Sequence, residues 1–86
     1  MNQYERKEAI ERVYAALQER GYRPDDQIIG YILTGDPAYI TNYKGARYLI
    51  TTIDQHDLLR DILKDYFRDE SLILTSQEDR IRRDAG

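Results

Sequence analysis

The chain has no cysteine among its 86 residues, and this absence limits how so short a protein can be stabilised. A domain of this length buries only about two-thirds of the surface that its unfolded chain exposes, so its apolar core is thin. Small domains usually compensate with disulfides, a bound metal or oligomerisation. Without cysteine, disulfides, iron–sulfur clusters, cysteine zinc sites and thiol catalysis are excluded. We therefore expect a single domain, with oligomerisation as the remaining route to stability.

Composition and charge restrict the location and the partners of the chain. It has 13 basic and 16 acidic residues, and its net charge of -3 repels phosphate backbones as a whole. Hydrophobic residues make up 41% of the chain, which suits a folded domain. Residues 1–7 are polar and apolar runs are short, so the sequence predicts neither a signal peptide nor a membrane span. We therefore predict a cytoplasmic location.

Two helices are predicted in the first half of the chain. Helical spacing relates the apolar residues Ile10, Val13, Tyr14 and Leu17. This pattern predicts a helix over residues 4–20, ended by Gly21. A second helix is expected to begin at Pro24, because proline suits the first helical position, and to end at Gly35. Its apolar residues are Ile28, Ile29, Ile32 and Leu33.

The segment after the second helix allows two interpretations. Ala46, Leu49, Ile50 and Ile53 have helical spacing, yet residues 50–53 are rich in β-branched side chains, which favour strands. We predict a helix over residues 42–52, with a strand as the alternative.

A last long helix is predicted to follow Asp54, which is a suitable N-cap. Its apolar residues are Leu58, Leu59, Ile62, Leu63, Tyr66 and Phe67. On its other side Asp57, Asp61 and Asp65 each precede a base by three residues, which favours ion pairs on a solvated face over a metal site. Residues 72–74 are apolar and could form a short strand or a hydrophobic clip, and a capping-box pattern at residues 75–78 allows a short helix to about Arg83. We expect instead that this tail packs loosely or docks on a second protomer.

The predicted fold class is all-α, a compact bundle of about four helices per protomer in a homodimer. Residues 1–70 form the helical domain, and residues 71–86 are a C-terminal extension that is flexible or a short helix.

Few residues suggest chemistry. The single histidine, His56, has no cysteine or second histidine to complete a zinc site, and we expect it at the surface. Gly30 and Gly35 have the spacing of phosphate-loop glycines, but Asp36 and Pro37 stand where lysine and serine or threonine are required. We predict a protein that is not an enzyme and that needs no cofactor or metal.

Tyrosine is abundant, with eight residues in the chain. Tyr39, Tyr43 and Tyr48 surround Lys44 and Arg47, a mixture that occurs in nucleic-acid sites and in protein interfaces. The net acidity favours a protein interface. The alternative is a nucleic-acid-binding regulator that uses the first two helices and the turn at residue 21 like a helix-turn-helix.

Three runs resemble the IreB family of small regulatory phosphoproteins of Gram-positive bacteria. They are residues 13–22 (VYAALQERGY), residues 27–41 (QIIGYILTGDPAYIT) and residues 46–47 (AR). The resemblance covers about residues 13–67. It implies an all-helical, non-enzymatic homodimer that is a substrate of a PASTA-type Ser/Thr kinase and that modulates cell-envelope stress or antibiotic tolerance.

The chain departs from the family pattern at two places. Arg23 replaces a capping asparagine, and no serine or threonine precedes Thr34, whereas family members are phosphorylated ahead of the first helix. The best remaining acceptors are Thr75 and Ser76, in a polar tail.

We predict that a proline-braced turn presents an aromatic anchor to an unidentified protein partner. The predicted surface consists of Gly30, Tyr31, Gly35, Asp36, Pro37, Ala38, Tyr39 and Ile40. The structural alternative is that this turn only fixes the angle between two helices, and that Gly30 allows close packing rather than the approach of a partner.

Overall fold

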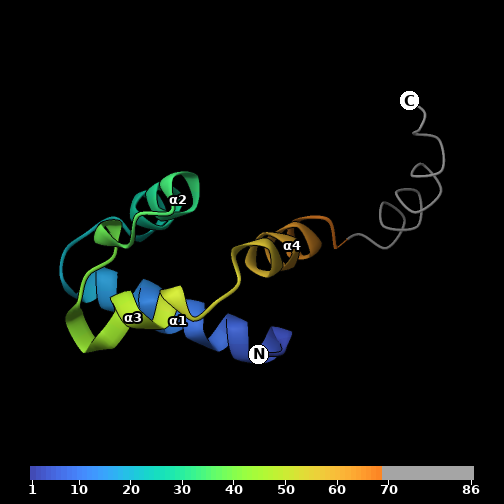
Figure 1. Cartoon of the computed structure of the whole chain (residues 1–86), viewed down its shortest axis with the longest axis horizontal. Coiled ribbons are helices and arrows are strands. Elements are labelled where there is room, and N and C mark those ends of the chain that lie inside the picture. The colour runs from blue at the N-terminus through green and yellow to red at the C-terminus, as the bar shows by residue number, and fades with distance from the viewer. Residues whose placement is uncertain (69–86) are drawn as a thin grey trace.

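The computed structural model describes residues 1–68, which form helices joined by short connections (Figure 1). The helices are α1 (Gln3–Glu19), α2 (Pro24–Thr34), α3 (Ala46–Thr51) and α4 (Gln55–Tyr66), and the 3-10 turns η1 (Pro37–Tyr39) and η2 (Tyr43–Gly45) connect α2 to α3. Residues 1–68 contain no strand, so the all-α prediction with about four helices is confirmed. The strand or clip predicted at residues 72–74 and the helix after it lie outside the described residues.

Helix α1 begins at a capping box that the sequence analysis overlooked. The Asn2 side chain accepts a hydrogen bond from the Glu5 N–H at 2.8 Å, and the Glu5 carboxylate accepts one from the Asn2 N–H at 2.9 Å. The box satisfies two N–H groups at the helix start. The helix ends as predicted, before Gly21, whose φ of +82° suits glycine.

The buried face of α1 is rotated slightly from the predicted one. Val13 and Leu17 are fully buried as expected, but Tyr14 remains 45% exposed. Ala9 and Ala16 are buried instead. Their short side chains let a neighbouring helix approach α1 closely, which a tyrosine would prevent.

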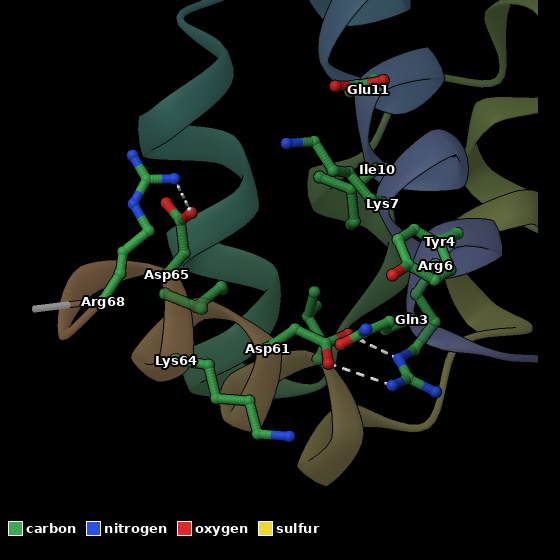
Figure 2. A pocket seen from close by; sticks show the side chains of 12 residues that line it. Gln3, Tyr4, Arg6, Lys7, Ile10, Glu11, Asp61, Lys64, Asp65 and Arg68 are labelled. Atoms are coloured by element: carbon green, nitrogen blue, oxygen red, sulfur yellow. Dashed lines mark hydrogen bonds and ion pairs between the residues drawn. The ribbon is translucent and has the colours of Figure 1, made fainter. Parts of the chain in front are cut away.

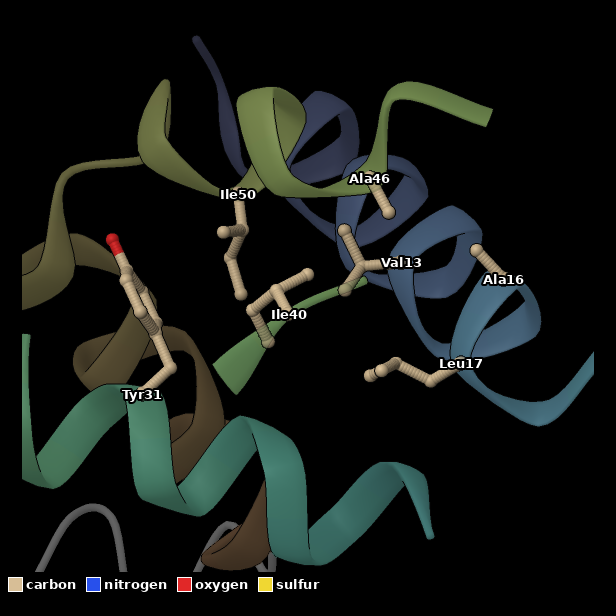
Figure 3. Packing of buried hydrophobic residues seen from close by; sticks show 7 residues of the cluster. All are labelled: Val13, Ala16, Leu17, Tyr31, Ile40, Ala46 and Ile50. Carbon is tan, nitrogen blue, oxygen red and sulfur yellow. The ribbon is translucent and has the colours of Figure 1, made fainter. Parts of the chain in front are cut away.

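The main core lies between α1, α2 and α3 (Figure 3). Its buried residues are Val13, Ala16, Leu17, Tyr31, Ile40, Ala46 and Ile50. Ile40 is fully buried although it belongs to the connection after η1 and not to a helix. Figure 3 shows its side chain between those of Val13 and Ile50. One connection residue thus helps to join the helices into one core.

Helix α2 has the predicted bounds but an unusual start. Arg23 at the N-cap makes no side-chain capping hydrogen bond. The Asp25 carboxylate accepts from the Asp26 N–H at 2.8 Å, and the Arg23 Nε lies 2.9 Å from the Asp26 carboxylate. The two aspartates therefore supply part of what a capping side chain would provide. Gly35, with a φ of +72°, closes the helix.

The ambiguous segment is helical, but its helix is shorter than predicted. Lys44 and Gly45 have φ angles of +53° and +72°, so α3 begins only at Ala46. The predicted start near residue 42 was wrong because positive φ angles interrupt a helix and the apolar spacing does not reveal them. At the helix end, the Thr51 hydroxyl donates to the Tyr48 carbonyl and the Thr52 hydroxyl to the Leu49 carbonyl, each at 2.6 Å.

Candidate functional site

The predicted partner surface is formed by the end of α2 and by η1, and its residues divide into two groups. Tyr31 and Ile40 belong to the buried core, where they cannot touch a partner without unfolding. The exposed or half-exposed residues are Gly35, Asp36, Pro37, Ala38 and Tyr39. The candidate surface is therefore the turn around η1.

This turn is held by local hydrogen bonds. The Asp36 carboxylate accepts from the Ala38 N–H at 2.9 Å, and the Thr34 hydroxyl accepts from the Asp36 N–H at 3.1 Å. The Gln27 side-chain amide donates to the Tyr39 carbonyl at 2.8 Å, which ties the turn back to α2. A turn fixed in this way presents its exposed side chains without an ordering cost on binding.

Gly30 lies directly beneath the Tyr39 ring. A Cβ added to Gly30 would stand 2.5 Å from the ring Cδ1 and 2.6 Å from Cε1. Non-bonded carbon atoms prefer separations of about 3.5–4.0 Å, so only glycine fits here. Tyr39 keeps 39% of its surface exposed while its ring covers the glycine. The close approach at Gly30 thus comes from within the chain, and Tyr39 has a structural contact besides its exposed edge.

Helix α4 carries a second candidate surface that the sequence analysis did not separate from the core. Its apolar spacing predicted a buried face, but of its residues only Leu58 is buried, together with Ala9 and Ile53. The other apolar residues are 40–78% exposed: Leu59, Ile62, Leu63, Tyr66 and Phe67. In Figure 1 this helix lies to one side of α1, α2 and α3. Its apolar face is uncovered within residues 1–68.

Helix α4 is attached to the rest of the protomer at its first half. The Asp54 carboxylate caps it by accepting from the Asp57 N–H at 2.9 Å. The Gln55 side-chain amide donates to the Ile32 carbonyl of α2 at 2.6 Å. Leu58 then supplies the apolar contact with α1.

The polar anchor of α4 is an ion pair that the sequence analysis assigned wrongly. Asp61 was expected to pair with Lys64, but the Arg6 Nε and Nη2 donate to its two carboxylate oxygens at 2.5 and 3.0 Å. The side chains of Arg6 and Asp61 are 14% and 22% exposed. A forked contact of this kind satisfies both groups at once and excludes water, so it outweighs a helix-surface pair. The other two predicted pairs, Asp57 with Arg60 and Asp65 with Arg68, are present at 3.8 and 3.4 Å.

The hydrogen bond from Arg6 lowers the pKa of Asp61 below its ordinary value, and its positive charge adds to the effect. A group whose pKa is lower in the folded state stabilises that state above its unfolded value of about 3.9. This stabilisation is lost as the pH falls through the folded pKa. The attachment of α4 should therefore weaken in acid.

Asp61→Asn is expected to loosen the attachment of α4 to α1. The change removes the negatively charged acceptor of Arg6 and leaves its guanidinium, which is 14% exposed, without an opposite charge. Amide hydrogen exchange in α4 should be about tenfold faster, the effect of losing a charged hydrogen bond. The variant should also lack the part of the acid dependence that Asp61 causes. Asp65→Asn is the matched control, because the Asp65–Arg68 pair is exposed on both sides. Equal exchange in the two variants would contradict the anchoring role.

The predicted cluster of tyrosines and bases is largely engaged within the protomer. The Arg47 Nε donates to the Ile40 carbonyl at 2.8 Å, and the Lys44 ammonium lies 3.3 Å from the Glu19 carboxylate. The Tyr43 ring lies under this ammonium, 5.3 Å away. Tyr48 is exposed. These contacts use the two bases for structure, so the cluster offers little free positive charge.

Among residues 1–68 no three histidine, cysteine, aspartate or glutamate side chains gather in a way that could hold a metal ion. His56 is exposed, as predicted, and its Nδ1 lies 3.4 Å from the Arg60 Nη2. No described helix has both the length and the apolar character needed to cross a bilayer. Thr75 and Ser76 lie outside the described residues.

Comparisons with known proteins agree with the resemblance noted in the sequence. The family model described as "IreB regulatory phosphoprotein" matches residues 1–68. A "UPF0297 protein" of Ruminiclostridium cellulolyticum is 46% identical over 67 residues, which cover 78% of this chain and 76% of that protein. The residues matched by the family model include α4 as well as the turn around η1. The chain therefore belongs to the IreB family of regulatory phosphoproteins.

Proposed function

We propose that this protein is a cytoplasmic, non-enzymatic homodimeric regulator, in which a second copy covers the apolar face of α4. The observation that carries the proposal is the stripe formed by Leu59, Leu63, Tyr66 and Phe67, all at least 40% exposed. These positions follow the spacing i, i+4, i+7 and i+8, so they share one side of the helix. Contiguous apolar surface of this kind marks an interaction site in a soluble protein.

Physical reasoning favours an identical partner. A helix of 12 residues is marginal in water by itself and depends on packing of its apolar face. In a two-fold dimer each protomer contributes the same face, so the apolar stripe of each copy covers the stripe of the other and no second kind of surface is needed. The α2 side chains Ile29 and Leu33 are also more than half exposed, so α2 carries apolar surface of its own.

We propose further that the dimer is an adaptor in signalling, regulated by a PASTA-type Ser/Thr kinase, and that it modulates cell-envelope stress or antibiotic tolerance. Membership of a regulatory phosphoprotein family supports this role. Deleting the gene in the native organism should change susceptibility to cell-wall antibiotics, and restoring the full chain should reverse the change. Unaltered susceptibility would contradict the envelope role.

Phosphorylation is expected at Thr75 or Ser76, because no serine or threonine precedes Thr34 in the sequence. A phosphate adds a charge of nearly minus two, and Arg80, Arg82 and Arg83 follow closely enough in the chain to pair with it. Phosphopeptide mass spectrometry after incubation with the kinase domain and ATP checks this, with the Thr75→Ala/Ser76→Ala double variant as control. No modification, or modification confined to residues 34–52, would contradict it.

The exposed turn around η1 is the proposed contact for the downstream partner. Ala38→Arg tests it more cleanly than a change at Tyr39, because Tyr39 also packs on Gly30. We expect this variant to keep the melting temperature and dimer mass of the natural chain but to weaken partner capture at least about thirtyfold, as for a hot-spot change of 2 kcal/mol. Normal capture by the variant would leave the turn with only its structural role.

The helix-turn-helix alternative is not favoured by the contacts described above. Helix α2 would be the recognition helix, yet its 11 residues include two aspartates and no lysine or arginine. Such a helix would repel the phosphates that provide most of the affinity for nucleic acid.

A further inference from the structure

A groove of about 740 Å³ separates the first half of α1 from α4 (Figure 2). Its apolar lining is formed by Ile10 of α1 and by Leu58 and Ile62 of α4. Figure 2 shows the α1 side chains on one side and Asp65 and Arg68 on the other, with Lys7 reaching into the space between them. The groove is distinct from the proposed dimer stripe, because none of the four residues of that stripe lines it.

We propose that residues 72–74 of the same chain (Leu72, Ile73 and Leu74) occupy this groove. These three residues are apolar, and they follow shortly after Arg68, which itself lines the groove. Seated there, they would cover Ile62, which is 44% exposed in residues 1–68. This occupant goes beyond the homodimer and the kinase regulation proposed above and does not depend on either.

The length of chain beyond the groove suits this occupant. Four residues from Arg68 to Leu72 span at most about 14 Å when extended. The stretch of α4 from Leu58 to Tyr66 rises about 12 Å, at 1.5 Å per residue. A reversal within residues 69–71, the length of a tight turn, lets residues 72–74 run back about 7 Å along α4, toward Ile62, which precedes Arg68 by about 9 Å.

Charge favours the same placement. Asp69 and Glu70 lie between Arg68 and the apolar triplet. Lys7, Lys64 and Glu11 line the groove, and none of them forms a salt bridge with another residue of the described part of the chain, so the charge left there is net positive. A tail that turns back over α4 brings its two carboxylates close to these ammonium groups.

Tethering favours the chain's own tail over that of a second copy. A segment joined to its site by a few residues has an effective concentration on the order of millimolar. A tail from a molecule outside the dimer competes at the protein concentration, which is micromolar in most experiments. The tail of the dimer partner starts farther from this groove than the chain's own Arg68, which lines it. The groove should therefore be filled within one protomer.

The test uses the full chain and a single spin label. The natural sequence has no cysteine, so Gln77→Cys provides the only site for a nitroxide. We expect paramagnetic broadening of backbone amides in residues 3–11 of α1, which are far from the label in sequence, whereas amides near Arg68 are broadened through the tether alone. Replacing Leu72, Ile73 and Leu74 with aspartate should abolish this broadening without changing the amide shifts of α2 and α3. Absence of broadening in the labelled chain, or broadening that survives the triple replacement, would overturn the proposal.

Two further measurements separate the charge contribution and the source of the tail. Lys7→Glu should weaken the broadening, whereas Arg12→Glu, on the same helix but outside the groove, should not. An equal effect of both changes would overturn the charge argument. Mixing spin-labelled unenriched protein with ¹⁵N-enriched unlabelled protein should broaden the groove amides of α1 much less than a label on the same molecule does. Equal or stronger broadening in that mixture would identify the tail of a second copy as the occupant and overturn the placement within one protomer.

Discussion

Gly30→Ala is expected to destabilise the protein by about 1–3 kcal/mol, the usual cost of overpacking a tight contact. The sign is opposite to the ordinary effect, because alanine inside a helix is favoured over glycine by about 1 kcal/mol. The new methyl group would stand 2.5 Å from the Tyr39 ring, so either the ring or the turn must move. Urea denaturation of the single variant measures the change in the free energy of unfolding.

A second background isolates the cause. In the Tyr39→Ala variant the ring is absent, so Gly30→Ala should become neutral or stabilise by up to about 1 kcal/mol. Gly35→Ala is the control, because it strains a residue with a φ of +72° that has no neighbour near an added Cβ. Gly35→Ala should lower the free energy of unfolding by the same amount with and without the Tyr39 ring. An unchanged cost of Gly30→Ala in both backgrounds would show that the ring does not set the requirement for glycine.

Leu63→Asp is expected to dissociate the homodimer. The replacement puts a charge in the middle of the stripe that the second copy covers, and burying an unpaired carboxylate is costly. Loss of an interface hot spot costs at least about 2 kcal/mol, which raises the dissociation constant about thirtyfold or more. Sedimentation velocity across a dilution series of each variant measures this constant.

The matched control places the same added charge away from α4. Gln18 is exposed in the second half of α1, so Gln18→Asp should leave the dimer intact. Dissociation by both variants would indicate that added negative charge, and not the apolar stripe, controls assembly. A dimer that withstands Leu63→Asp would place the interface elsewhere on the protomer.

Local signals predicted most of the helical boundaries. Gly21 and Gly35 end their helices and Pro24 begins α2 because these residues act through the backbone of their own segment. The start of α3 was missed because Lys44 has a positive φ, a conformation that is uncommon for residues other than glycine, and apolar spacing carries no record of it.

Contacts between distant segments account for the other differences. Arg6 and Asp61 are 55 residues apart, and Asp61 had a plausible partner, Lys64, only three residues away. Ile40 showed no periodic pattern, because it stands alone in a connection, yet it is at the centre of the core. Only the fold brings these side chains together.

The candidate site was predictable in part. The sequence indicated the turn around Pro37. Why residue 30 must be glycine becomes clear only when the position of the Tyr39 ring is known. The apolar face of α4 was recognised from its spacing. Periodicity shows that one side of a helix is apolar but not what covers it, so the exposure of Leu63 became apparent only from the packing of the protomer.

Sedimentation equilibrium of the natural 86-residue chain tests the central claim most directly. At micromolar concentrations we expect a mass about twice that of the 10.2 kDa protomer. Because folding and association are coupled in such a dimer, the melting temperature should also rise with protein concentration. A mass of 10.2 kDa at every concentration, with a melting temperature that does not depend on concentration, would contradict a homodimer built on α4.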